Sequence, residues 1–92
     1  MAHSGETFRI QGAMRLEQAK QLLADGEQGI KNGVRHFDLA AVEAIDSSAL
    51  AVLLGWRRQA EEQKLPIRFT GAPANIRALA ELYGLSELLF AA

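Results

Sequence analysis

The chain has 92 residues, of which 49% are hydrophobic and 23% are charged, and its formal net charge is −1. This length fits one domain with a modest core, and the balanced charge gives no electrostatic basis for binding nucleic acid or an anionic membrane. The sequence contains no cysteine, and its 2 histidines lack the ligand spacing of a zinc site. We therefore expect no disulfide, no metal and no cofactor.

The sequence shows no sign of a targeting or membrane-spanning segment. Residues Met1–Glu6 lack the basic region and apolar core of a signal peptide. No apolar run approaches the ~20 residues that are needed to cross a bilayer. We expect a single domain over residues 1–92, located in the cytoplasm, without direct insertion into a membrane.

Periodicity predicts the first elements in chain order. Thr7–Gln11 alternates polar and apolar residues, which predicts a half-buried strand that ends at Gly12. Met14–Ala24 carries apolar residues at helical spacing and predicts an amphipathic helix. The glycine-rich stretch 26–33 predicts a loose connection. Val34–Leu39 alternates again and predicts a second strand.

The middle of the chain predicts its longest helix. Ala40–Ile45 is expected to form a loop, and Ser47–Gln63 has an apolar stripe at helical spacing. Trp56 lies on this stripe, so we expect it to pack in the core. Gly55 should cost the helix roughly 1 kcal/mol relative to Ala, and we expect another element to approach closely there.

The last third of the chain predicts one more strand and helix. Leu65–Thr70 is expected to form a strand and Ala74–Tyr83 a helix, with Leu82 and Tyr83 in the core. Leu85–Phe90 is expected to form a short turn or strand. Strands that alternate with helices predict an α/β fold with a mixed, mostly parallel sheet of about four strands and helices mainly on one face.

A polar step within Ile45–Leu50 places a carboxylate and two hydroxyls, those of Asp46, Ser47 and Ser48, where a helix begins. The first N–H groups of a helix lack partners within it, and the helix dipole favours negative charge there. The step can therefore cap the helix through Asp46 or Ser47, hold an anion, or present a hydroxyl to a kinase or a partner protein.

Asp38 and Asp46 together could suggest a pair of catalytic carboxylates. However, no His or Lys follows either residue closely to complete acid–base chemistry, and the sequence has no glycine-rich phosphate loop. We expect Asp38 to accept hydrogen bonds from nearby backbone N–H groups. The chain is accordingly expected not to be an enzyme.

Phe37–Leu39, Ile45–Ser48 and Leu79–Leu85 together resemble the STAS domain family, and the resemblance extends from Thr7 to Leu89. That family includes bacterial anti-sigma-factor antagonists and the cytoplasmic tails of sulfate transporters. It also includes the small cytoplasmic subunit of the Mla-type phospholipid ABC transporter. The resemblance implies a STAS-like fold that acts as a non-catalytic protein-interaction module.

The same resemblance implies a role for Ser47. In the antagonists, the residue directly after the aspartate is phosphorylated by a partner kinase, and in the Mla subunit the matching threonine contacts the transporter's ATPase. Both branches imply that Ser47 faces a partner. Capping is compatible with this role, because Asp46 can cap the helix while Ser47 points outward. The further residues expected to bind the partner are Ser48, Leu50, Arg57 and Arg58.

The two branches of the family predict different functions for this chain. This chain has Ala49 where antagonists usually carry glycine, and Gly12–Arg15 replaces a pattern with an acidic residue, so roles tied to that acid do not carry over. The resemblance favours an accessory subunit that docks on an ABC transporter ATPase, peripheral to the inner membrane. Antagonists typically continue into a further helix after the stretch that matches Leu85–Phe90, whereas this sequence, like the Mla subunit, stops at about that point. The alternative is an antagonist that binds an anti-sigma factor and a serine kinase. A small nucleotide-binding protein is a third alternative, supported by one helix end alone.

Overall fold

The computed structural model describes residues 2–4 and 7–90, which form a four-stranded sheet with the strand order β1-β2-β3-β4. The strands are β1 (Ala2–Ser4), β2 (Thr7–Met14), β3 (His36–Ile45) and β4 (Arg68–Thr70). The helices are α1 (Leu16–Lys31), α2 (Ser48–Glu62), α3 (Ala74–Leu82) and α4 (Ser86–Phe90). The expectation about a signal peptide at the start of the chain concerns residues that lie partly outside this description.

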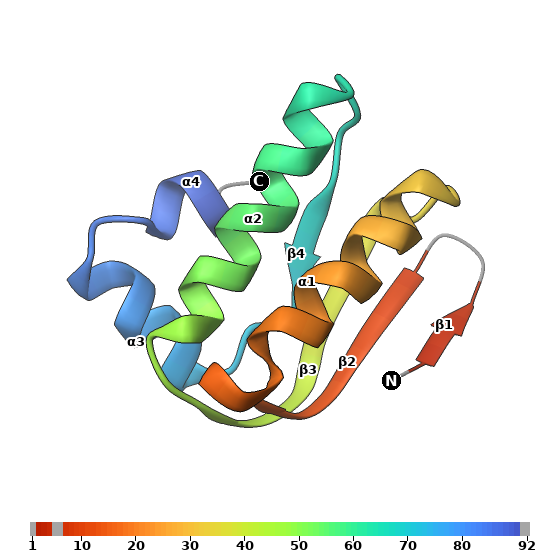
Figure 1. Cartoon of the computed structure of the whole chain (residues 1–92). Helices are drawn as coiled ribbons and strands as arrows, with labels where there is room; N and C mark the ends of the chain where they lie inside the picture. Colours follow the sequence, from red (N-terminus) through yellow and green to blue (C-terminus); the bar gives the residue numbers. More distant parts are fainter. Residues whose placement is uncertain (1, 5–6, 91–92) are drawn as a thin grey trace.

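The sheet is mixed and mostly parallel, as the sequence predicts. β1 runs antiparallel to β2, whereas β2, β3 and β4 run parallel. Figure 1 shows α1 and α2 side by side across one face of the sheet, with α3 and α4 to one side. The predicted fold class is therefore confirmed. Among the described residues, no helix has the length and apolar character needed to cross a membrane.

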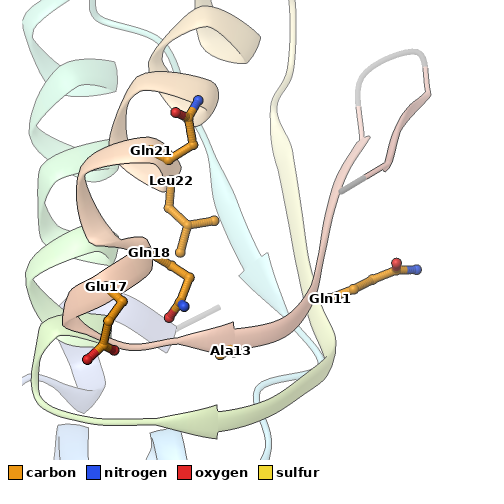
Figure 2. Close-up of a pocket in the computed structure, with 6 residues that line it drawn as sticks. All are labelled: Gln11, Ala13, Glu17, Gln18, Gln21 and Leu22. Atoms are coloured by element: carbon orange, nitrogen blue, oxygen red, sulfur yellow. The ribbon is translucent and has the colours of Figure 1, made fainter.

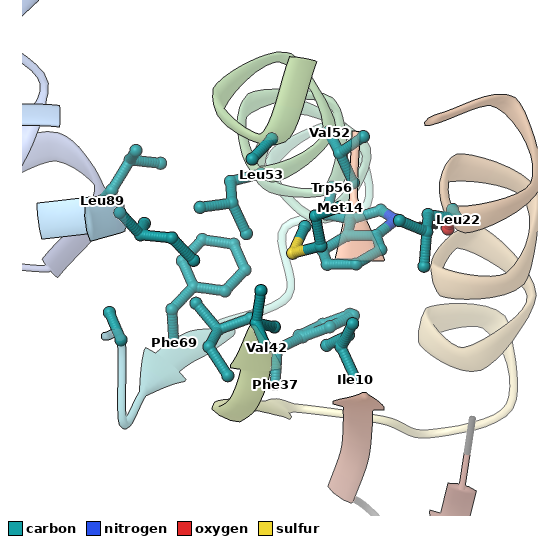
Figure 3. Packing of buried hydrophobic residues seen from close by; sticks show 14 of the residues in the cluster. Ile10, Met14, Leu22, Phe37, Val42, Val52, Leu53, Trp56, Phe69 and Leu89 are labelled. Carbon is teal, nitrogen blue, oxygen red and sulfur yellow. Dashed lines mark hydrogen bonds between the residues drawn. The ribbon is translucent and has the colours of Figure 1, made fainter. Parts of the chain in front are cut away.

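The core forms between these two helices and the sheet around Trp56, whose side chain is fully buried. Its indole ring stacks on Phe37 with 4.6 Å between ring centroids, and Phe8 and Phe69 lie next to them. The indole N–H donates a 3.1 Å hydrogen bond to the carbonyl of Leu22 in α1. Figure 3 shows the indole between Leu22 and Phe37, so one side chain joins both helices to the sheet.

Two glycines explain how α1 and α2 approach so closely. A Cβ on Gly26 would overlap the indole of Trp56, and a Cβ on Gly55 would lie 2.5 Å from Leu23 Cδ2. The close approach predicted at Gly55 is confirmed. The loose connection predicted for 26–33 is wrong, because α1 continues to Lys31. Gly26 and Gly29 are buried inside the helix, where packing outweighs the low helix propensity of glycine.

Two further predictions about the sheet are wrong. β2 does not end at Gly12 but continues to Met14, and Ala40–Ile45 is strand rather than loop. These two segments pair with each other, with register shifts on both sides of the Gln11–Gly12 step. Gly12 has a φ of +81°, which glycine adopts readily at a bulge. Pairing thus satisfies backbone groups in a stretch whose small residues do not show strand periodicity.

The end of the chain also differs from prediction. Leu85–Phe90 was expected to be a turn or strand, but Ser86–Phe90 is a helix whose Leu89 is buried in the core. Leu82 and Tyr83, expected in the core, are 75% and 58% exposed. The reason is that α3 ends there in a Schellman motif, in which the Leu85 N–H bonds the carbonyl of Ala80 at 2.8 Å. The chain turns away before those two side chains can reach the core.

Candidate functional site

β3 ends directly before the start of α2, and the polar step lies between them. Asp46 Oδ1 accepts a 2.8 Å hydrogen bond from the backbone N–H of Ser48, which is the geometry of an N-cap. Asp46 Oδ2 accepts a 3.1 Å hydrogen bond from the backbone N–H of Leu16 at the start of α1. One carboxylate therefore ties the starts of both helices together.

These donors hold the carboxylate of Asp46 in its ionised form. The Leu16 N–H contributes most to lowering the pKa of Asp46, and the N–H and hydroxyl of Ser48 lower it further. Removal from water opposes this effect but does not reverse it. Asp46 is thus a charged cap at neutral pH.

Ser47 occupies a different position from its neighbours. Its side chain is exposed and makes no capping hydrogen bond, because Asp46 serves as the cap. Ser48 is half-buried, and its hydroxyl faces the carboxylate of Asp46. The arrangement leaves the Ser47 hydroxyl at the surface, within the positive field of the helix N-terminus.

The structure adds Leu16 to this surface, a residue that the sequence did not single out. Leu16 is 70% exposed, and its backbone N–H is bonded to Asp46, so an apolar side chain flanks the start of α2. Leu16 is one of the apolar residues at helical spacing in Met14–Ala24, which predicts that it is buried, whereas the hydrogen bond between segments far apart in the chain places it next to Asp46 at the surface. The hydroxyl of Ser47 and the exposed side chain of Leu16 therefore both lie at the surface near the start of α2.

The other residues expected to bind a partner differ in their exposure to solvent. The prediction that Leu50 binds a partner is wrong, because this side chain is 5% exposed and packs in the core, where a partner cannot reach it. Arg58 is exposed on the later part of α2. Arg57 is half-buried, with its Cζ 5.8 Å from the centroid of the Phe69 ring.

The carboxylate of Asp38 accepts hydrogen bonds from different donors than the carboxylate of Asp46 does. Its Oδ1 accepts a 3.0 Å hydrogen bond from the Ala40 N–H, and its Oδ2 forms a 3.1 Å ion pair with Arg9 Nε. The Ala40 N–H contributes most to lowering the pKa of Asp38, and Arg9 lowers it further against the opposing effect of burial. The two carboxylates therefore have separate sets of donors, and each binds a nearby backbone N–H together with a group from a distant segment.

His36 connects strands on the sheet. His36 Nδ1 lies 3.3 Å from Thr7 Oγ1, and His36 Nε2 is hydrogen-bonded to Thr70 Oγ1. These two contacts join β3 to β2 on one side and to β4 on the other. Within residues 2–4 and 7–90, no group of three or more His, Asp or Glu side chains lies together as metal ligands would.

A shallow groove of about 300 Å³ lies between β2 and α1 (Figure 2). The residues that line it are Gln11, Ala13, Glu17, Gln18, Gln21 and Leu22. Glu17 is the single titratable side chain in this set, and the other polar groups are neutral amides. The groove therefore offers no pair of groups for general acid–base chemistry.

The comparisons with known proteins agree with this fold. The family model described as "Mlab, STAS domain" matches residues 2–90, and the chain therefore belongs to the STAS domain family. Among solved structures, the chain is similar to the anti-sigma factor antagonist SpoIIAA in its unphosphorylated form, with a TM-score of 0.65 and 17% sequence identity. That alignment covers 92% of this chain and 79% of SpoIIAA. No curated protein sequence matches the chain significantly.

Proposed function

We propose that this chain is a non-catalytic accessory subunit that docks on the ATPase of a Mla-type phospholipid ABC transporter through the start of α2. The observation that carries the proposal is the Ser47 hydroxyl, which is exposed because Asp46 alone caps the helix. Leu16 supplies an apolar contact beside it. Membership in a family described by the Mla name supports the choice of transporter. Such a subunit would work in the cytoplasm, at the inner membrane.

The proposal is tested by copurification with the ABC ATPase encoded in the same genome. Ser47→Glu and Ser47→Arg should each reduce the recovered ATPase at least about tenfold, because a bulky charged side chain would disrupt a packed contact. Gln28→Glu and Gln28→Arg are matched controls. Gln28 is exposed on α1, about 18 Å along the helix from Leu16 at its start. Equal recovery of the ATPase with all four variants would rule out this docking surface.

A second candidate is an anti-sigma-factor antagonist that is switched by phosphorylation of Ser47. The exposed hydroxyl favours it, since a phosphate of about −1.5 to −2 charge at a helix N-terminus would be tolerated by the fold while repelling a docked partner. A serine kinase with anti-sigma activity should add one phosphate to the wild type and none to Ser47→Ala, as read by intact mass. A phosphate located on Ser48 would contradict this assignment.

A further inference from the structure

A second surface feature lies between α2 and α4, outside the polar step. It is a cleft of about 170 Å³. The residues that line it are Leu54, Arg57, Arg58 and Glu61 of α2 and Leu88 of α4. The lining includes two arginines and one glutamate, so its formal charge is positive. Figure 1 shows α4 packed beside the middle of α2.

Arg57, one of the residues that line this cleft, has a buried hydrogen-bond donor without an acceptor in the part of the chain that the structure describes. Its Nε is buried and has no hydrogen-bond partner within residues 2–4 and 7–90, while its guanidinium lies over the ring of Phe69. A buried donor without an acceptor costs free energy, and a charged donor costs more than a neutral one. A carboxylate in the cleft would meet this guanidinium and that of Arg58, and charge-assisted hydrogen bonds would offset part of the cost.

Leu54 and Leu88 form the apolar part of the cleft lining. Leu88 is 49% exposed and Leu54 is half-buried. A purely polar ligand would leave these side chains in water. The surface is therefore complementary to a segment that presents a carboxylate next to an aliphatic or aromatic side chain.

The cleft lies on the same face of α2 as Ser47. Ser47, Ala51, Leu54 and Arg58 follow one another at spacings of four, three and four residues, which places them in one stripe along the helix. Each of them is exposed or half-buried. The stripe extends about 16 Å from Ser47 to Arg58. A protein that covers Ser47 and continues along α2 would reach the cleft.

We propose that the cleft between α2 and α4 is a second docking point, which receives an acidic and apolar segment of the protein partner. The proposal rests on the proposed docking function and names the chemistry of the partner. The segment places its carboxylate against Arg57 and Arg58 and its apolar side chain against Leu54 and Leu88.

The test uses the full chain, labelled with ¹⁵N, and a capped amphipathic peptide that carries Leu and Glu on one face. The peptide should shift the backbone amide signals of Leu54, Arg58 and Leu88. Replacing each Glu of the peptide by Gln should weaken binding about tenfold, because the charge-assisted hydrogen bonds are lost. Arg58→Glu should weaken binding at least as much, and Arg68→Glu, at an exposed site on β4, should not.

Arg58 is exposed, so its substitution tests the cleft without disturbing the packing over Phe69. Equal binding of the Glu and Gln peptides, shifts confined to the groove between β2 and α1, or no shifts at about 1 mM peptide would each overturn the proposal. The ATPase copurification separates the two proposals. Loss of the ATPase with Ser47→Arg but not with Arg58→Glu would leave the proposed function standing and remove the second docking point.

Discussion

Asp46 accepts hydrogen bonds from the starts of two helices, and its ionised form is the one that both donors stabilise. Because its folded-state pKa lies below the unfolded value of about 3.9, its contribution to stability is fully present above that value. The contribution is lost as the pH falls through the lower, folded-state pKa. Acid pH should therefore weaken the contacts that hold the starts of both helices together.

Replacing Asp46 by Asn should reduce stability at pH 7, because the amide oxygen can accept only one of the two hydrogen bonds and the amide NH2 would face the other N–H group. The difference from the wild type should shrink as the pH falls below about 4, where the unfolded chain begins to bind the proton, and should be lost as the pH falls through the lower folded-state pKa of Asp46. Urea unfolding between pH 7 and pH 3 measures this. Ser47→Ala is the matched control and should keep the wild-type pH dependence, since Ser47 makes no capping bond.

Gly26 in α1 and Gly55 in the neighbouring α2 should respond differently to replacement by Ala. Gly26→Ala should destabilise the protein by about 1–3 kcal/mol, because its methyl group would overlap the rigid indole of Trp56. Gly55→Ala should be close to neutral. Its methyl group would meet the flexible end of Leu23, and the gain in helix propensity of about 1 kcal/mol offsets that contact.

Denaturant unfolding of the two variants measures the difference. Equal destabilisation by both substitutions would mean that the contact between Gly26 and Trp56 does not set the spacing of α1 and α2.

The same elements show what the sequence could predict and what it could not. Strong periodicity located β2, α2 and the start of α1, because one face of each is buried. The C-terminal half of α1 was missed, because Gly26 and Gly29 are breakers by propensity and become favourable only against Trp56 and Val34. The helical state of α4 was missed because five residues are too few to show a period.

The candidate site divides in the same way. Asp46 and Ser47 could be identified from the sequence because a polar step before an apolar helix is a local signal. Leu16 and the cleft beside Arg57 could not, because each depends on a contact between segments far apart in the chain. The burial of Leu50 likewise depends on how α2 is rotated against the sheet.

At the scale of the whole molecule, Trp56 links the two long helices to the sheet. Trp56→Ala should cost about 3–5 kcal/mol, a large share of the roughly 5–15 kcal/mol that stabilises a typical domain. Trp56→Phe keeps a stacked ring but loses the hydrogen bond to Leu22, so a smaller loss is expected. Thermal unfolding followed by far-UV circular dichroism compares the two. A Phe variant as unstable as the Ala variant would contradict the packing role of the ring.

Trp56 is the one tryptophan in the chain, and its indole lies against α1, α2 and the sheet at once. Its fluorescence therefore reports from the interior of the molecule, without an added dye. A partner that presses on the outer side of α2 and changes the spacing between the helices would alter the indole's surroundings and shift its emission. The intrinsic fluorescence of Trp56 can thus be used to follow binding of a partner at the surface of the protein.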